Sequence, residues 1–454
     1  MPAQAKKGKS LPWPRHFKSV VASTGTPGQV TISWKPQGKK GHTKTKTIKI
    51  ETGLTQFSPY TKKLPTHGRH SHVFYVKWKG KGAGHLTLGA KQLAAAGASV
   101  GSGNTVYYRI WSINKKGKKR HVRTDGKLRT FVPRGYAPSG SQTVTIGSYN
   151  VRSAGLDLGN SHNWYKGRGA QVAKNIAGSK PGIMLIQEAL PGPQGGNPSQ
   201  LQDLVKKVNA DVGGDGTANP YTAVRYGYYD PASDGSKYYG TQQGMRILYD
   251  TKRYAMIGNC SDGVGVPQGR VPATMHDNSS CSIKLPVASG DSVKKTRWAA
   301  YAEFQAKDST GKLVGRPFWV VSVHLDERTG AKYNALKLAQ MKAITAYMNK
   351  IRGGAPVILG GDFNDFQNDQ TGYGNSAHDY LVSSGWYDTA AAYSQYNLKY
   401  PTINHFQTSK VGANGAGVRM DMILTEGVRG ANSFLIKTNA GSDHNMIVAT
   451  TKLP

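Results

Sequence analysis

Residues 357–365 read VILGGDFND. The apolar run that opens this stretch predicts a strand at the buried centre of a sheet. Asp362 and Asn364 follow it with one residue between them. Alternate side chains of an extended backbone point to the same side, so we expect a carboxylate and an amide to face one site. The alternative for Asp362 is an Asx turn that only shapes the backbone, and Asp365 is expected to cap a following segment.

The same pattern, an apolar run ending in an acid, an amide or an imidazole, recurs in five more segments. They are TIGSYNVR with Asn150, IMLIQEAL with Glu188, VVSVHL with His324, RMDMIL with Asp421, and GSDHNMIV with Asp443 and His444. A polar residue at the end of a buried strand is common by itself. Six such segments in succession predict strands that share one polar edge.

Helical patterns alternate with these strands. Residues 168–179, 199–210 and 332–351 are helix candidates, and the apolar residues of the last one fall mainly on one stripe. Strands that alternate with helices predict an α/β fold in which helices cover the sheets.

The order and spacing of the six motifs resemble the endonuclease/exonuclease/phosphatase superfamily over roughly residues 143–453, with GDFN and the terminal SDH as the most specific part. The resemblance implies a four-layered α/β sandwich, in which two packed mixed β-sheets are flanked by helices and the active site lies along one edge. It also implies hydrolysis of phosphate esters with a divalent cation, Mg²⁺ first and Mn²⁺ or Ca²⁺ as alternatives.

The resemblance assigns a role to each polar residue. Hard divalent cations take oxygen ligands, and the metal ligands implied are Asn150, Glu188 and Asp443. The catalytic residues implied are Asp362 beside the attacking water, His444 as general base, Asp421 as its orienting carboxylate, His324 at the leaving group, and Asn364. Histidine suits proton transfer because its ordinary pKa lies near neutrality.

Substrate contacts are expected from Asn150, Asn364 and Arg419, with a surface ion pair as the alternative for Arg419. One departure concerns pancreatic-type deoxyribonucleases, which pair the leaving-group histidine with a carboxylate near a strand resembling MRILYD. Here Gln242 and Gln243 stand in that neighbourhood. Neutral amides could orient His324 but raise the pKa of a histidine less than a carboxylate does. This departure argues against close kinship with that subgroup and leaves the resemblance to the superfamily intact.

The formal net charge is +35, from 60 Lys and Arg against 25 Asp and Glu. Residues 1–137 hold 28 of the basic residues and only two of the acidic ones. An excess of this size indicates a polyanionic partner, for which we expect DNA and also RNA. The clusters KPQGKKGHTKTKTIK (residues 35–49) and INKKGKKRHVR (residues 113–123) suit phosphate contacts. Solvated loops, or an anionic wall or glycan partner, are the alternatives.

Three parts are predicted along the chain. Residues 1–131 form a basic all-β sandwich, residues 132–142 (VPRGYAPSGSQ) a linker, and residues 143–454 the catalytic domain. QVTISWKP and YYRIWSINKKGK resemble strands of fibronectin type III modules, although Val106 stands where many of them have a corner tyrosine.

The two cysteines, Cys260 and Cys281, are expected to form one disulfide, which implies an oxidising compartment. Two unpaired thiols are the alternative. No apolar run approaches the length of a membrane span, and no signal-peptide pattern appears at the start. We expect a secreted monomer.

The sequence therefore predicts a metal-dependent phosphodiesterase, with a DNA endonuclease of little sequence preference as the first hypothesis. A phospholipid phosphodiesterase of the sphingomyelinase type would use the same residues. It would need an element that enters lipid, and the tyrosine-rich residues 225–239 are the only candidate. A polyanion-binding adhesin with an inactive catalytic fold is the third hypothesis.

Overall fold

We describe a computed structural model of the chain. It describes residues 16–37, 46–57, 60, 71–78, 82–116, 119–157, 162–190, 197–213, 220–225, 245–258, 260–262, 281–290, 297–367, 374–438 and 441–454. The chain divides into two compact units. The first comprises Met1–Val100 and Asn104–Arg134, and the second comprises Gly101–Gly103 and Gly135–Pro454.

The first unit contains two antiparallel sheets and the short helix α1 (Ala90–Ala95). One sheet has the order β1 (Phe17–Ser23), β2 (Val30–Pro36), β5 (Gly84–Leu88), and the other has the order β4 (His72–Lys77), β3 (Thr47–Gly53), β6 (Val106–Lys116), β7 (Lys119–Thr124), with β8 (Arg129–Phe131) also on β6. Val30, Ile32 and Trp34 alternate inward along β2 and share a core with Ile48 and Ile110. The resemblance to fibronectin type III modules stays a prediction.

Two mixed sheets make up most of the second unit. In the described residues, one has the order β14 (Ser261–Asp262), β11 (Tyr221–Arg225), β12 (Arg246–Asp250), β10 (Ile183–Gln187), β9 (Gln142–Asn150), β23 (Met446–Leu453), β22 (Ser433–Lys437), β20 (Ser394–Tyr396). The other has the order β13 (Tyr254–Ile257), β16 (Trp298–Lys307), β17 (Leu313–His324), β18 (Val357–Gln367), β21 (Arg419–Glu426), β19 (Tyr387–Asp388), with β15 (Ser282–Lys284) also on β16.

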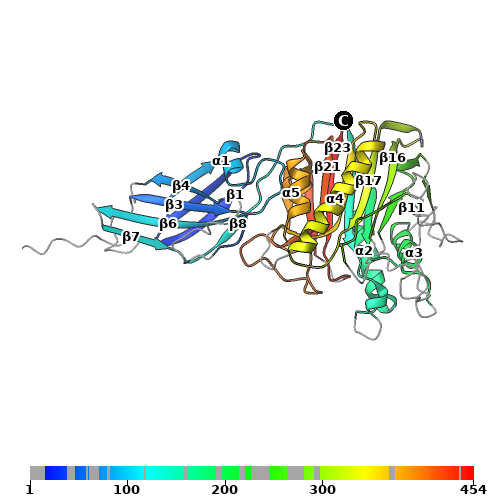
Figure 1. The fold of residues 1–454 in the computed structure, drawn as a ribbon, viewed down its shortest axis with the longest axis horizontal. Helices are drawn as coiled ribbons and strands as arrows, with labels where there is room; N and C mark the ends of the chain where they lie inside the picture. Colours follow the sequence, from blue (N-terminus) through cyan, green and yellow to red (C-terminus); the bar gives the residue numbers. More distant parts are fainter. Residues whose placement is uncertain are drawn as a thin grey trace, which may run out of the picture. The chain divides into compact units, whose positions relative to one another are not determined.

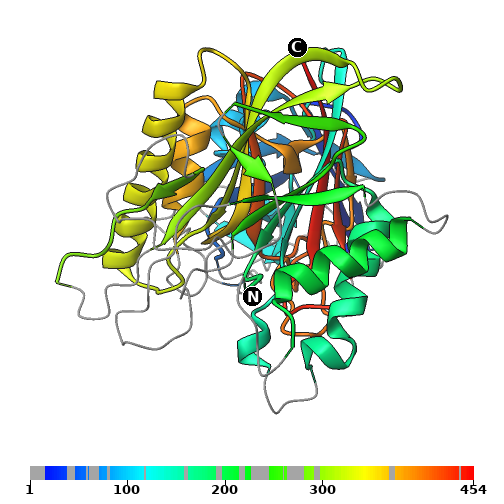
Figure 2. The ribbon, with the colours of Figure 1, turned by 90° about the vertical axis from the view of Figure 1, so that its right-hand side faces the viewer.

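These sheets pack face to face, and helices cover their outer faces (Figures 1 and 2). Ile146 and Leu185 of the first sheet share the central core with Val320 and Ile358 of the second. The outer face of the first sheet packs against α2 (Gly169–Ser179) and α3 (Gln200–Val212), and that of the second sheet against α4 (Ala331–Ile351) and α5 (Ser376–Ser383). The unit thus has the four α/β layers predicted from the sequence.

Two glycines let the strand β18 approach its neighbours closely. A Cβ on Gly360 would lie 2.8 Å from Leu185 Cδ1 of the opposite sheet. Gly361 has a φ of 146°, and its Cβ would meet the carbonyl oxygen of Val323 at 2.0 Å. Any side chain at either position would push Asp362 away from the adjoining strands.

The prediction that every polar residue ends a strand is wrong for three of them. Asp421 lies near the beginning of β21, and Asp443 and His444 precede β23. Both strands are antiparallel to the strands beside them, β18 and β9, so their beginnings lie at the edge where those neighbours end. The residues at the beginnings of β21 and β23 therefore lie at the same polar edge as the residues that end β18 and β9.

Cys260 and Cys281 form the predicted disulfide, with their Cα atoms 5.8 Å apart. Several other predictions concern residues outside the described part of the chain: Gln242 and Gln243, residues 226–239 of the tyrosine-rich stretch, and residues 38–45 and 117–118 of the basic clusters. Among the described residues, no helix has the length and apolar character required to span a membrane.

Reduction of the disulfide should lower the free energy of unfolding by about 3 kcal/mol, because the bond closes a loop between residues 21 apart and restricts the unfolded chain. Urea unfolding with and without reductant measures this change. The double variant Cys260→Ala/Cys281→Ala should show the lower stability and no response to reductant. An unchanged midpoint after complete reduction would contradict the expectation.

Candidate active site

Strand register in the second sheet places three polar residues in one row. His324 on β17 lies opposite Asp362 on the parallel strand β18, and Asp362 lies opposite Asp421 on the antiparallel strand β21. All three side chains are buried, with Asp421 fully so. The backbone hydrogen bonds of the sheet thus bring together an imidazole and two carboxylates, although His324 and Asp421 are 97 positions apart in the sequence.

The first sheet supplies a second row at the same edge. Asn150 is the last residue of β9 and pairs with Gln187 of the parallel strand β10, so Glu188 follows directly. His444 stands just before β23, whose Ile447 pairs with Ser148 of β9. Asn150 Nδ2 donates to Asp362 Oδ2 at 3.1 Å, and this hydrogen bond joins the two rows across the sheets.

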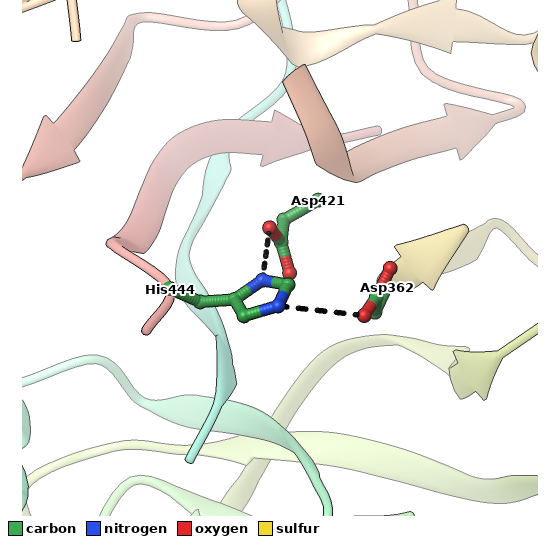
Figure 3. A group of neighbouring side chains, drawn as sticks. All are labelled: Asp362, Asp421 and His444. Carbon is green, nitrogen blue, oxygen red and sulfur yellow. Dashed lines mark hydrogen bonds and ion pairs between the residues drawn. The ribbon is translucent and has the colours of Figure 1, made fainter. Parts of the chain in front are cut away.

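Asp362 stands between the two histidines, and Figure 3 shows it beside His444. Its Oδ2 lies 3.5 Å from His324 Nε2 and 3.9 Å from His444 Nε2. The other ring nitrogen of His444, Nδ1, lies 2.9 Å from Asp421 Oδ2. Asp421 therefore fixes the orientation of the His444 ring, and the ring directs Nε2 toward Asp362.

Burial and mutual repulsion shift the pKa values of this group. Burial, followed by the negative charge of Asp421, raises the pKa of Asp362 to about 7. Burial alone would lower the pKa of His444, but the carboxylates of Asp421, Asp362 and Asp443 outweigh it and raise this pKa to about 10. In the absence of a cation, His444 thus holds its proton at neutral pH, and Asp362 titrates near neutrality.

The amide of Asn150 bridges the two carboxylates closest to it. Nδ2 donates to Glu188 Oε1 at 3.0 Å as well as to Asp362, and Glu188 Oε2 accepts from the backbone N–H of Ser153 at 2.9 Å. The amide oxygen of Asn150 accepts from the N–H of Arg152. In this orientation the amide nitrogen faces the carboxylates and holds Glu188 and Asp362 in place, and the metal contact of Asn150 stays a prediction.

Asn364 does not continue the strand alternation that the sequence suggested. Its φ is 47°, its N–H donates to Asp362 Oδ1 at 2.9 Å, and its Nδ2 donates to the carbonyl of Leu325. Asp362 therefore forms an Asx turn with one oxygen and faces the histidines with the other. Asn364 contacts the backbone next to His324, and Lys337 Nζ in turn donates to the Asn364 carbonyl at 2.6 Å.

Asp365 caps a helix, as expected. Its Oδ2 accepts from the N–H of Ala377 at 2.7 Å at the beginning of α5, and burial raises its pKa to about 6. The helix itself was not predicted. Asp365 is therefore structural and lies outside the acid–base group.

Arg152 has a role that the sequence motifs did not indicate. Its Nη1 lies 2.6 Å from Asp443 Oδ2, and its Nε lies 3.0 Å from Asp157 Oδ1. Ser442 Oγ donates to the other oxygen of Asp443 at 3.2 Å. Both oxygens of Asp443 thus have protein partners, as do those of Glu188 and Asp362, and the metal contact of Asp443 stays a prediction. The only signal in the sequence was the position of Arg152, two residues after Asn150.

Arg419 is placed differently from the expectation. Its side chain is buried, its Nη2 lies 3.0 Å from Asp388 Oδ2, and it also donates to the carbonyl of Gly103 at 2.7 Å. His378 Nε2 lies 3.0 Å from the same Asp388 oxygen. Burial would raise the pKa of Asp388, but Arg419 and His378 lower it to about 2. This buried ion pair replaces the predicted phosphate contact.

Left-handed backbone gathers around this edge of the sheets. Among the described residues, eight that are not glycine have a positive φ, and five of them are Arg152, Glu188, Asn364, His405 and Phe406. His405 and Phe406 lie in the segment that hydrogen-bonds to Asp443, since the N–H of His405 donates to its carbonyl at 3.0 Å. Strained backbone of this kind is concentrated at functional sites in proteins.

The donor set fits a hard divalent cation. Ligand atoms of Asp362, Asp421 and His444 lie within 4.8 Å of one another, and Glu188 joins them through Asn150. In the described part of the chain, Asp421 Oδ1 is buried without a hydrogen-bond partner. Because His444 Nδ1 is committed to Asp421, the carboxylates of Glu188 and Asp362 are the residues that would hold the cation.

No protein-family model and no curated protein matches the chain. Among solved structures, an endonuclease/exonuclease/phosphatase family protein from Bacteroides thetaiotaomicron is 20% identical over 69% of this chain and 98% of its own, with a TM-score of 0.46. A mannosyl-6-phosphatase from the same organism is 20% identical over 67% and 98%, with a TM-score of 0.46. The human Nocturnin catalytic domain is 16% identical over 70% and 96%, with a TM-score of 0.41. At these values the assignment of an activity depends on the site itself.

Replacing Arg419 with Met should destabilise the protein by about 3–5 kcal/mol, because it leaves Asp388 charged and buried. Urea unfolding measures the loss. In the parent protein, the contribution of Asp388 to the free energy of unfolding should be complete above about pH 4. It should disappear as the pH falls toward 2, since the pKa of Asp388 is lowered on folding.

Arg352→Met is the matched control, because it removes a partly exposed ion pair with Glu426 at the other end of β21. This change should cost about 1 kcal/mol or less. If Arg419→Met leaves the stability unchanged and raises KM, the result would support the predicted contact of Arg419 with phosphate.

Proposed function

We propose that the chain is a secreted, divalent-metal-dependent phosphodiesterase that acts as an endonuclease on DNA, and also on RNA, with little sequence preference. The observation that carries the proposal is the meeting of Glu188, Asp362 and the two histidines at one buried edge, linked through Asn150. Each of these residues has a chemical function in cleavage of a phosphate ester.

Hydrolysis of a phosphodiester needs a base for the attacking water and a group that stabilises the leaving oxygen. Asp362 is positioned to orient the water, and the His444–Asp421 pair to take up its proton. His324, on the other side of Asp362 Oδ2, is the candidate proton donor to the leaving oxygen. A bound divalent cation would offset the negative charge of the phosphate and lower the pKa values of the water and of His444.

The polyanionic substrate is supported by the charge of the chain and not by the site. Lys18, Lys35 and Lys77 on β1, β2 and β4 of the first unit are exposed and, like most of the basic excess, lie before residue 137. Lysine and arginine side chains that bind phosphates release counterions, so they strengthen binding without base specificity. The disulfide supports secretion, because such bonds persist in oxidising compartments.

Substitution of the proposed cation and proton-transfer residues should separate their roles. His444→Gln should lower kcat for plasmid nicking by about 10²–10⁴-fold, since it removes a positioned acid–base group. Asn150→Ala should raise the Mg²⁺ concentration needed for half-maximal activity by about 10–100-fold, because Glu188 and Asp362 lose the amide that orients them. A chelator should abolish nicking by the parent protein.

Asp308→Asn is the matched control, because this carboxylate lies in the turn between β16 and β17, at the opposite end of β17 from His324. It should nick DNA like the parent. Chelator-resistant nicking would refute metal dependence. Hydrolysis of sphingomyelin vesicles without DNA cleavage would favour the phospholipid phosphodiesterase, and absence of both activities with any divalent ion would favour the adhesin.

Neutralising the three lysines in the full chain, Lys18→Gln/Lys35→Gln/Lys77→Gln, should weaken DNA binding and its dependence on salt. The slope of log affinity against log salt should fall by about 0.9 for each phosphate that is no longer neutralised. Hydrolysis of a small phosphodiester should not change. The control neutralises three exposed lysines of the second unit, Lys252, Lys312 and Lys350. An equal effect of both triple variants would show that only total charge matters.

A further inference from the structure

Two flat side chains stack against each other beside the site. The rings of His162 and Phe406 are parallel within 4°, with centroids 3.9 Å apart. The Phe406 ring is half-buried, and the His162 side chain is exposed. The guanidinium of Arg152 lies 5.6 Å from the centroid of Phe406. We call His162 and Phe406 the aromatic platform.

The platform is attached to the residues around His444. The N–H groups of Asn404 and His405 donate to the Asp443 carbonyl, at 2.7 and 3.0 Å. Asn404 Nδ2 donates to Asn445 Oδ1 at 2.7 Å, and Asn404 Oδ1 accepts from the N–H of Phe406 at 2.7 Å. The same Arg152 that contacts Phe406 pairs with Asp443. Phe406 is thus held by the two residues that flank His444 in the sequence.

Holding Phe406 in this position requires unfavourable backbone. His405 and Phe406 have consecutive φ values of 51° and 62°. Residues other than glycine, asparagine, aspartate and histidine rarely adopt this left-handed region, so Phe406 is the unusual residue of the two. Neither residue contributes to the core between the two sheets. Backbone strain maintained in a segment outside the core, with an aromatic ring at its end, indicates a ring whose position serves binding.

We propose that the aromatic platform stacks the nucleobase that flanks the scissile phosphate, with the base lying on the exposed imidazole of His162. This inference rests on the proposed function and adds a substrate contact to it. A base is planar and has a polar edge, so it can cover the platform while its edge stays in water. Stacking of this kind binds every base and does not depend on sequence.

The position of the platform favours a base over an aliphatic chain. Flat groups, an imidazole and a phenyl ring with a guanidinium beside them, offer planar faces and no apolar wedge. Arg152 also supplies a positive charge between the platform and Asp443, the residue that precedes His444. The proposed ligand is therefore a nucleotide unit, with its base on the platform and its phosphate at Asp362 and His444.

A double-mutant cycle between the platform and the base tests the proposal. The substrate is a single-stranded oligonucleotide with one cleavable phosphodiester, its other linkages being methylphosphonates. Two analogues lack the base on the 5′ or the 3′ side of that bond. For the parent protein, kcat/KM should fall roughly tenfold for one of the two analogues, mainly through KM. Phe406→Leu keeps apolar bulk but loses the flat ring. With the complete substrate, its kcat/KM should be about tenfold lower than that of the parent, and removing the base from the substrate should cause no further fall.

Phe406→Tyr should restore the dependence on the base, because it restores the flat ring. Tyr396→Leu, at an exposed tyrosine on β20, is the control and should behave like the parent. If the base analogues cost Phe406→Leu as much as they cost the parent, the two groups do not interact and the proposal is overturned. Loss of kcat alone in Phe406→Leu, with KM unchanged, would also overturn it.

A binding measurement separates this proposal from the proposed function. Oligonucleotides carrying 2-aminopurine next to the phosphodiester are mixed with the His444→Gln variant, in which cleavage is slow enough for binding to be measured. Stacking should quench the fluorescence, and adding Phe406→Leu should remove the quenching. If the parent cleaves no nucleic acid, the proposed function fails, and the platform is then judged by quenching alone. Absence of quenching with Phe406 intact would refute the platform in either case.

Discussion

The hydrogen-bonded register of β17, β18 and β21 is the constraint on which the site depends. It sets His324, Asp362 and Asp421 side by side, and a shift of one residue in any of the three strands would turn that strand's polar side chain to the other face. Gly360 and Gly361 keep β18 close to its neighbours and to the opposite sheet. Nearly all of the surrounding structure can thus be understood as support for one row of three residues.

Concentrated negative charge is the second property of the site. Two carboxylates on adjacent strands are buried together, and their partners in the described part of the chain are imidazoles and amides, with no lysine or arginine paired to Asp362. Such an arrangement raises the pKa values of Asp362 and His444 and is stable only with protons or a cation present. Arginine pairs with other carboxylates: Arg152 with Asp443 beside His444, Arg419 with Asp388, and Arg168 with Asp157. Among the described residues, the chemistry of the site therefore follows from two carboxylates, Asp362 and Asp421, whose charged partners are histidines and not lysine or arginine.

The sequence allowed the prediction of those features that depend on local pattern. Apolar runs and helical stripes located β9, β10, β17 and β18 and the helices α2, α3 and α4, and their strand-end residues do meet at one edge. The direction of β21 and β23 could not be predicted, because a strand pattern reads the same from either end. The sequence did not predict the buried ion pair of Arg419, because its partner Asp388 lies 31 positions away and belongs to no recognised motif. The left-handed turn of Asn364 and the stacking of His162 on Phe406 likewise depend on contacts between distant segments.

The division of the chain has a practical consequence for attempts to isolate the second unit. Gly101–Gly103 lie within the sequence of the first unit but belong to the second. The carbonyl of Gly101 accepts from the N–H of Asp388, and that of Gly103 accepts from Arg419. A fragment begun at Gly135 would lack both acceptors and leave a buried guanidinium short of one partner. The second unit is thus completed by a tripeptide that precedes most of it in the sequence, and truncation at Gly135 would remove part of its interior.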